Sequence, residues 1–320
     1  MSEHRQGDQA FRADSLYGRQ PEMNYGGTLS FLRRRYTREI AGADVVVSGI
    51  PFDSAVSHRP GTRFGPQAVR AASAQLAELD AFPWHFDPFA TLAVADYGDC
   101  FIDFGYPLAV AEQIRNHARD ILASNARMLT LGGDHFITYP LLQAHAERHG
   151  PLALVQIDAH PDTWDDDGER LDHGTMITRA MREGLIDVEH SIQVGIRTAA
   201  PDYGITVLDA PWVHEHGIRA VLERIRATVG DRPVYVSFDI DSIDPAYAPG
   251  TGTPVCGGLT SAQALALVRG FGPLDPIGMD IVEVSPAYDH AEITALMAAT
   301  IGHDYLCTLA ANRRQAGSKA

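Results

Sequence analysis

Short apolar runs alternate with longer amphipathic segments along most of the chain. The apolar runs are rich in β-branched and aliphatic residues and cover 45–47, 128–131, 152–157, 191–194, 206–208, 234–238 and 277–282. The amphipathic segments between them cover 67–79, 108–123, 139–149, 218–229, 261–269 and 292–309. Continuous apolar strands separated by helix-length segments are typical of a parallel sheet covered by helices on both faces. The pattern therefore predicts an α/β fold, a three-layer αβα arrangement around a central, mostly parallel sheet.

The N-terminal segment does not follow this alternation. Residues 1–28 are polar, contain several glycines and show no periodicity, so we expect them to form an N-terminal arm. Residues 29–320 contain no internal repeat and no low-complexity linker. A chain of 320 residues with 45% hydrophobic residues can build one large core, so we expect a single domain over 29–320.

Carboxylates and imidazoles follow the predicted strands at the point where each apolar run ends. They are His135, Asp158, His160, Asp162, Asp239 and Asp241, with Glu283 after the last strand. A single Asp-x-Asp or Gly-Gly at a strand end is commonly only a turn or a cap. Independent turns would not all place charged groups after consecutive strands, whose carboxyl ends gather functional groups in such sheets. The combination therefore indicates bound metal.

The number and type of these side chains favour two hard divalent ions. Residues two apart on an extended chain share a face, which pairs Asp158 with His160 and Asp239 with Asp241. Six donors, four of them carboxylates, exceed what one tetrahedral ion uses. An oxygen-rich set suits Mn²⁺ better than Zn²⁺, although Co²⁺, Fe²⁺ and Zn²⁺ remain alternatives. Paired ions lower the pKa of a bound water, which predicts metal-assisted hydrolysis.

Composition limits the partners. A formal net charge of −15 disfavours a nucleic-acid partner, because binding to phosphate requires a basic surface. No apolar run approaches the ~20 residues of a membrane span. Cys100, Cys256 and Cys307 are odd in number and far apart, which is typical of free thiols in a reducing compartment. We therefore expect a cytoplasmic protein that binds neither nucleic acid nor membrane.

The three ligand motifs resemble those of the arginase and agmatinase family, the binuclear manganese ureohydrolases. The motifs are Gly132-Gly133-Asp134-His135, Asp158-Ala159-His160-Pro161-Asp162 and the segment from Ser237 to Pro245. The similarity extends from about 45 to about 300 and includes the segments at 61–66, 250–254 and 283–286. The segments 82–87 and 173–176 are most similar to bacterial agmatinases.

This resemblance implies an arginase-like fold and a role for each residue. One manganese would be bound by His135, Asp158, Asp162 and Asp239, and the other by Asp158, His160, Asp239 and Asp241. Asp241 is also counted among the catalytic residues, with His173 as the proton shuttle to the leaving amine and Glu283 as the carboxylate that orients the guanidinium. The implied reaction is attack of a metal-activated hydroxide on a small cationic guanidine, and the implied assembly is a homo-oligomer, a trimer or hexamer.

The segment after Asp162 bears on which guanidine is used. Family arginases have an Asn-containing loop at this point, where the present chain has Trp164, which disfavours free arginine. The acidic loop 165–169, with Asp165 as a candidate substrate contact, suits the ammonium end of agmatine. By charge alone, a solvated acidic loop is an equal alternative. The cations that could reverse the local charge are Arg59, Arg63 and Arg170.

We therefore expect hydrolysis of agmatine to putrescine and urea, a step of polyamine biosynthesis, with two Mn²⁺ per subunit. A guanidinobutyrase or another guanidino-acid ureohydrolase is the first alternative. A single-zinc, deacetylase-like amide hydrolase would leave His135, Asp241 and Glu283 unexplained. A non-catalytic metal-binding protein predicts loss of a ligand, of His173 or of Glu283, and all of them are present.

Overall fold

A computed structural model describes residues 8–19, 22–78 and 80–317. Within these residues, nine strands form one sheet in the order β1-β3-β2-β4-β9-β8-β5-β6-β7, and every neighbouring pair is parallel. The strands are β1 Arg35–Tyr36, β2 Val45–Gly49, β3 Val94–Asp99, β4 Arg127–Leu131, β5 Ala153–Ile157, β6 Ile192–Ile196, β7 Thr206–Asp209, β8 Val234–Asp239 and β9 Gly278–Val282.

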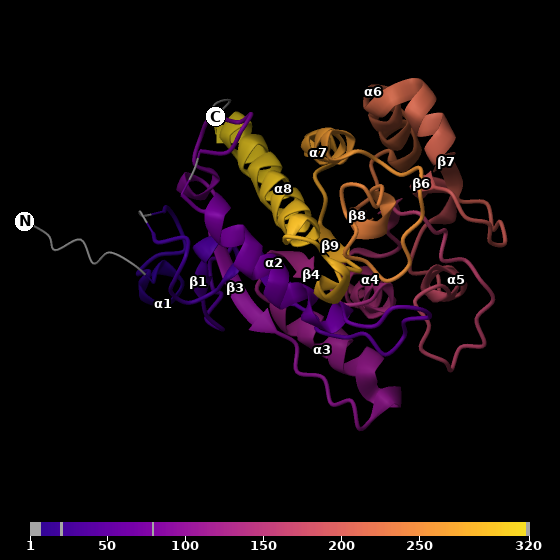
Figure 1. The fold of residues 1–320 in the computed structure, drawn as a ribbon, viewed down its shortest axis with the longest axis horizontal. Coiled ribbons are helices and arrows are strands. Elements are labelled where there is room, and N and C mark those ends of the chain that lie inside the picture. The colour runs from indigo at the N-terminus through magenta and orange to yellow at the C-terminus, as the bar shows by residue number, and fades with distance from the viewer. Residues whose placement is uncertain (1–7, 20–21, 79, 318–320) are drawn as a thin grey trace, which may run out of the picture.

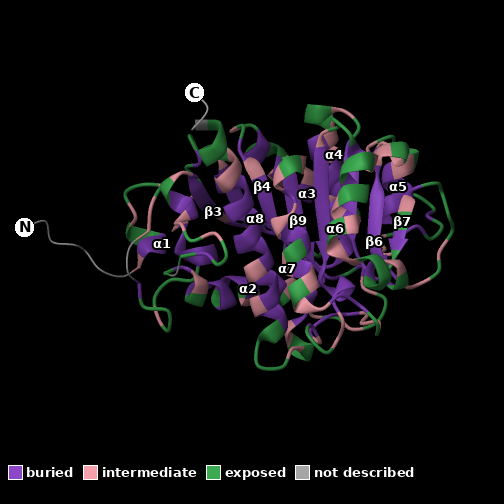
Figure 2. Ribbon diagram, turned by 90° about the horizontal axis from the view of Figure 1, so that it is seen from above, coloured by how far each residue is buried: buried purple, intermediate pink, exposed green. Residues whose placement is uncertain are grey.

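Helices cover both faces of this sheet, which confirms the predicted three-layer αβα arrangement (Figures 1 and 2). One layer contains α2, α8, α7 and α6, which contact one another in that order, and the other contains α3, α4 and α5. The helices are α1 Gln9–Arg12, α2 Gly65–Ser73, α3 Val110–Leu122, α4 Thr138–His149, α5 Met176–Arg182, α6 Ala210–Val229, α7 Ser261–Arg269 and α8 Ile293–Gly317. None of the described helices is long and apolar enough to cross a membrane.

Successive strand residues point into two separate cores, one under each helix layer. On β2, Val45 and Val47 pack into the core that α8 covers, whereas Val46 packs into the core that α3 and α4 cover. All five residues of β2 are buried, as are all five of β5 and of β9. Burial on both faces explains why these strands are continuous apolar runs in the sequence.

The apolar runs predicted seven of the described strands and the amphipathic segments predicted most of the helices, but β1, β3, α1 and α5 were not predicted. The β3 sequence contains Asp96 and Gly98 and so lacks an apolar run. Asp96 is nevertheless fully buried, because Arg70 of α2 donates two hydrogen bonds to it, at 2.8 and 3.0 Å. The predicted helix 218–229 is only the second part of α6, which Gly217 interrupts with a φ of 76°.

The described part of the N-terminal segment lies against the body of the protein. Gly18 and Leu16 form backbone hydrogen bonds with Phe89 and Val94. The buried Arg33 side chain donates to carbonyl oxygens of this segment, one of them Met23 at 3.0 Å. Because these carbonyls accept hydrogen bonds from a buried side chain, the segment contributes to the fold of a single chain. The expected boundary at residue 28 stays a prediction, and residues 1–7 and 20–21 of the expected arm lie outside the described residues.

Replacing Arg70 by methionine should destabilise the protein strongly. The substitution removes the positive charge and leaves the buried Asp96 carboxylate without its partner, for an expected loss of about 3–5 kcal/mol in unfolding free energy. Urea denaturation followed by circular dichroism measures this loss. The matched control is Arg119→Met, since Arg119 pairs with Glu147 on the surface, and its unfolding midpoint should not change measurably. Equal losses in the two variants would contradict the interpretation.

Candidate functional site

The sheet order brings the predicted site residues to one edge. Strands β4, β9, β8 and β5 are consecutive neighbours near the middle of the sheet. Because they are parallel, their carboxyl ends meet on the same side, where open α/β sheets bind ligands. The six candidate metal ligands, which lie at or soon after the carboxyl ends of β4, β5 and β8, are brought together there, with Glu283 directly after β9.

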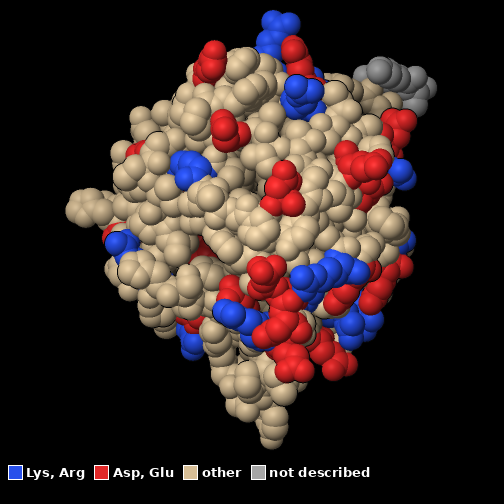
Figure 3. Space-filling view, turned by 90° about the vertical axis from the view of Figure 1, so that its right-hand side faces the viewer, with Lys and Arg blue, Asp and Glu red and all other residues tan. Residues whose placement is uncertain are grey.

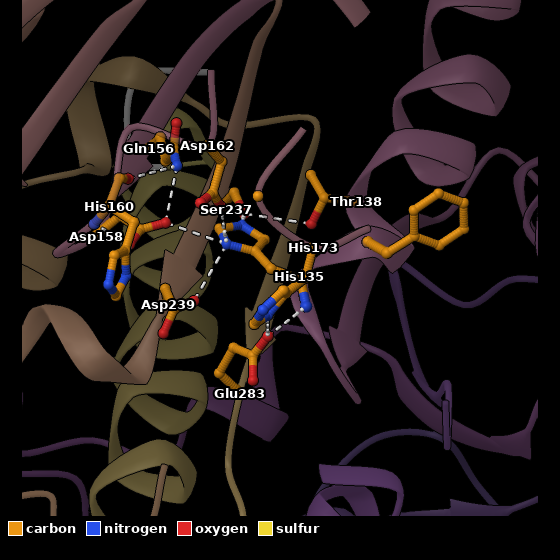
Figure 4. A network of polar contacts seen from close by, with 12 residues as sticks. His135, Thr138, Gln156, Asp158, His160, Asp162, His173, Ser237, Asp239 and Glu283 are labelled. Carbon is orange, nitrogen blue, oxygen red and sulfur yellow. Dashed lines mark hydrogen bonds and ion pairs between the residues drawn. The ribbon is translucent and has the colours of Figure 1, made fainter. Parts of the chain in front are cut away.

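The first group of ligands surrounds the ring of His135 (Figure 4). Its Nδ1 atom lies 3.1 Å from Asp158 Oδ2, 2.9 Å from Asp162 Oδ2 and 3.1 Å from Asp239 Oδ2. Asp162 reaches this position with a left-handed backbone, at a φ of 52°. A non-glycine residue in this conformation is strained, and such residues concentrate at functional sites.

The second group surrounds His160 and shares one carboxylate with the first. His160 Nδ1 lies 3.0 Å from Asp241 Oδ2 and 3.6 Å from Asp158 Oδ1. His135, Asp158 and Asp162 thus form one set whose atoms could hold a metal ion, and Asp158, His160 and Asp241 form another. Asp158 belongs to both sets, which places it between two potential ion positions.

Burial raises the pKa values of three carboxyl groups in the site, and the neighbouring carboxylates raise that of an imidazole. Burial raises the pKa of Asp162 to about 7, and the charge of Asp158 adds to this increase. Burial, together with neighbouring carboxylates, also raises the pKa of Asp239 and of Asp241. Burial alone would lower the pKa of His160, but Asp241 and Asp158 outweigh it and raise this pKa to about 12. The site therefore strongly attracts positive charge.

A hydrogen-bond chain behind His135 determines which of its ring nitrogens can bind a metal. The Ser237 hydroxyl donates to Asp280 at 2.7 Å, so its oxygen accepts the proton of His135 Nε2, 2.8 Å away. Thr138 and Tyr235 also donate to the buried Asp280 carboxylate. His135 Nδ1 is then left as the free acceptor, buried and without a hydrogen-bond partner among the described residues. Such an orphaned nitrogen among three carboxylates fits a metal ligand.

Glu283 and His173 form a contact next to these clusters. The Glu283 Oε1 atom accepts from the His135 backbone N–H and lies 2.8 Å from His173 Nδ1. Glu283 is 1% exposed, and its other oxygen, Oε2, has no hydrogen-bond partner among the described residues. Burial lowers the pKa of His173, but Glu283 outweighs burial and raises it to about 9. Glu283 therefore has one oxygen engaged and one available to a cationic ligand.

A cavity of about 500 Å³ lies over the clusters. Its described lining comprises Ser57, His135, His160, Asp162, Trp164, Asp165, Arg170, Asp172, His173, Gly174, Thr175, Thr198, Asp239, Asp241 and Thr253. Trp164 is 36% exposed, with its ring centroid 6.3 Å from that of His160. Its ring packs so closely on Gly174 that a Cβ there would lie 2.9 Å from it. The cavity is large enough for a small organic cation, with an indole in its wall.

The acidic loop is less available to a ligand than its sequence suggests. The Asp166 carboxylate is buried in an ion pair with Arg179, and Asp167 accepts two backbone N–H groups of its own loop. Asp165 lies at the cavity and accepts a hydrogen bond from Tyr203 at 3.2 Å. On the face at the α5 and β7 end, acidic side chains are interspersed with basic ones (Figure 3).

The three arginines that could reverse the local charge differ in position. Arg63 pairs with Asp53, and the Arg59 guanidinium stacks 5.1 Å from the Tyr288 ring centroid. Arg170 lines the cavity and pairs with Asp172.

Asp172 and Ser57 line the cavity but were not predicted as site residues, because isolated polar loop residues give no pattern.

A parallel α/β sheet with His/Asp clusters below a cavity defines a class, the α/β enzymes with a metal site. Residues 43–307 match the model of the arginase family, and the chain belongs to that family. It is 58% identical over 315 residues, 98% of each chain, to an agmatinase of Chromobacterium violaceum. These findings confirm the predicted family, and with it an agmatinase-like hydrolase that acts on C–N bonds other than peptide bonds.

Two solved structures are similar to this protein over most of its length. The crystal structure of a hypothetical agmatinase from Burkholderia thailandensis is 60% identical, with a TM-score of 0.94, and covers 97% of this chain and 99% of that one. Proclavaminate amidino hydrolase from Streptomyces clavuligerus is 42% identical, with a TM-score of 0.85, over 90% of this chain and 99% of that one. The arginase-like arrangement of the sheet is therefore confirmed.

Divalent metal should raise the thermal unfolding midpoint of chelator-treated protein. Mn²⁺ would neutralise the buried carboxylates, and at about 100 times the dissociation constant such linkage stabilises by about 2.7 kcal/mol. Differential scanning fluorimetry with and without Mn²⁺ measures the shift. The Asp158→Asn variant should lose most of it, whereas Asp231→Asn, an exposed control, should retain it. A full shift in Asp158→Asn would show that the stabilising ion binds elsewhere.

Proposed function

We propose that the protein hydrolyses agmatine to putrescine and urea with two Mn²⁺ per subunit. The observation that carries this proposal is the pair of His/Asp groups that share Asp158 below the cavity. The substrate is supported by the agmatinase of Chromobacterium violaceum, which covers 98% of this chain. The likeness to proclavaminate amidino hydrolase keeps a guanidino-acid substrate as the second candidate.

The proposed ligands follow from the two groups. His135, Asp158, Asp162 and Asp239 would hold one ion, and Asp158, His160, Asp239 and Asp241 the other. Asp239 joins the first group through its Oδ2 atom, 3.1 Å from His135 Nδ1. The bound pair would supply positive charge that activates a water molecule near neutral pH. With its Nε2–H directed to Ser237, His135 would bind the first ion through Nδ1.

Glu283 would bind and orient the guanidinium. Its Oε2 atom is a buried acceptor without a partner among the described residues, which is costly unless a ligand donates to it. A guanidinium presents parallel N–H groups that match a carboxylate. The backbone of Glu283 is left-handed, with a φ of 65°, which points to a functional constraint at this position. The carboxylate would hold the guanidinium carbon within reach of the activated water.

His173 would supply the proton for the leaving amine. Addition of water to the guanidinium carbon forms a C–O bond. The bond between this carbon and the nitrogen that carries the alkyl chain then breaks, which requires a proton on that nitrogen. His173 lines the cavity, and its raised pKa, about 9, keeps a proton available at neutral pH. The products are urea and a primary amine.

We also propose a cytoplasmic location and a homo-oligomeric assembly. The three cysteines are free, with Cys100 and Cys307 buried, which supports a cytoplasmic location. A homo-oligomer, a trimer or hexamer, is proposed from the family resemblance.

Removing a proposed ligand or the guanidinium carboxylate should abolish urea release. Asp239→Ala removes a ligand proposed for both ions, and Glu283→Gln removes the negative charge that orients the substrate. We expect kcat/KM for agmatine to fall by at least about 10²-fold in each variant. A colorimetric urea assay with added Mn²⁺ measures this, with Glu223→Gln on the exposed face of α6 as the control. Near-wild-type turnover in either site variant would refute the assignment.

A substrate panel tests the tail specificity. We expect kcat/KM to be highest for agmatine, with arginine and 4-guanidinobutyrate at least about tenfold lower, because Asp165 would attract an ammonium and repel a carboxylate. In Asp165→Asn the preference for agmatine over 4-guanidinobutyrate should shrink, whereas Glu169→Gln, in the same loop, should leave it unchanged. A strong preference of the wild type for the acid would favour the guanidinobutyrase alternative.

A further inference from the structure

Ser57 contacts His173, the proposed proton donor, on the side of the ring opposite to Glu283. Its hydroxyl oxygen lies 2.8 Å from His173 Nε2, and its backbone nitrogen lies 3.1 Å from the same atom. The other ring nitrogen, Nδ1, lies 2.8 Å from Glu283 Oε1. The imidazole is therefore held at both nitrogens, by segments that are far apart in the sequence.

The loop that carries Ser57 is itself anchored to the turn after β4. Asp134, next to a proposed ligand, accepts a hydrogen bond from the Ala55 N–H at 2.8 Å, and its own N–H donates to the Phe52 carbonyl at 2.7 Å. A Cβ on Gly133 would lie 1.8 Å from the same carbonyl oxygen, so only glycine permits this approach. The Gly-Gly-Asp-His motif thus has a second use, because it fixes the loop that reaches His173.

The same loop is tied to the His173 segment and closed at its far end. The His173 backbone N–H donates to the Ala55 carbonyl at 3.3 Å. The buried Asp53 carboxylate accepts from the Gly61 N–H at 3.0 Å and pairs with Arg63. Ser57 therefore has a defined position at the cavity wall, although its side chain is exposed.

We propose that Ser57 is a positioning residue, whose hydroxyl fixes the ring of His173 for proton delivery to the leaving amine. Glu283 holds the ring at Nδ1, and the Ser57 hydroxyl holds it at Nε2 by a contact shorter than the one from the Ser57 backbone nitrogen. Losing the hydroxyl leaves only the longer contact at Nε2, so the ring is held less firmly. Proton transfer needs the donor within hydrogen-bond reach of the accepting atom, so a freely rotating ring is often misplaced. This inference rests on the proposed function, because it takes His173 to be the proton donor to the leaving amine.

The test compares Ser57→Ala, Ser57→Thr and the control Ser54→Ala, an exposed serine in the same loop. Ser57→Ala should lower kcat for agmatine about tenfold with little change in KM, since the interaction serves only the transition state. Ser57→Thr, which keeps the hydroxyl, should restore most of the loss, and Ser54→Ala should match the wild type. A raised KM with unchanged kcat would instead make Ser57 a substrate contact and overturn the proposal.

A double-mutant cycle separates action through His173 from an independent effect. In a His173→Asn background, Ser57→Ala should cause no further loss of kcat, because the ring it positions is absent. Independent, multiplicative losses would overturn the inference.

A readout without turnover separates this inference from the proposed function. If the wild type releases urea from none of the guanidines, the proposed function fails. The side-chain NMR resonances of His173 then still report on the ring, and they should change in Ser57→Ala and be retained in Ser57→Thr. Unchanged His173 resonances in Ser57→Ala would overturn the positioning role by themselves.

Discussion

Mutual compensation of buried charge determines the architecture of the site. Asp158, Asp162, Asp239 and Asp241 are all buried beside two imidazoles. Burial raises the pKa of three of these carboxyl groups, and only positive charge between them makes the arrangement tolerable. Protons on His135 and His160 can supply that charge, and so can divalent cations at the same positions. Metal binding should therefore release protons from a site whose geometry already exists.

The spacing of the motifs has a direct physical reason. The Asp239 Oδ1 atom accepts the backbone N–H of Asp241 at 2.8 Å, and Asp158 Oδ1 accepts that of His160 at 2.7 Å. In each case the first carboxylate is held by the residue two positions later, which leaves its Oδ2 atom to face His135. The Asp-x-Asp and Asp-x-His patterns thus orient their own carboxylates. The local sequence therefore specifies much of the geometry of the proposed metal ligands, the metal end of the site.

Sequence reasoning reached the fold and the ligand clusters because both depend on local patterns. Buried parallel strands are continuous apolar runs, and the proposed ligands follow these runs directly. The β3 strand was missed because Asp96 interrupts its apolar pattern, and its pairing with Arg70 is a tertiary contact. The positions of Ser57 and Asp134 depend likewise on contacts between distant segments. No pattern in one sequence records such contacts.

The two ends of the site therefore differ in how they are built and in how they can change. The proposed metal end stands on buried strands of the sheet, where a substitution disturbs charge compensation and packing together. The substrate end consists of loops joined by a few hydrogen bonds, such as those of Asp165 and Ser57. Within the acidic loop, Asp166 and Asp167 serve the loop itself. Counting charges in the sequence thus overstates the field at the substrate tail, and tail specificity depends on which individual carboxylates face the cavity.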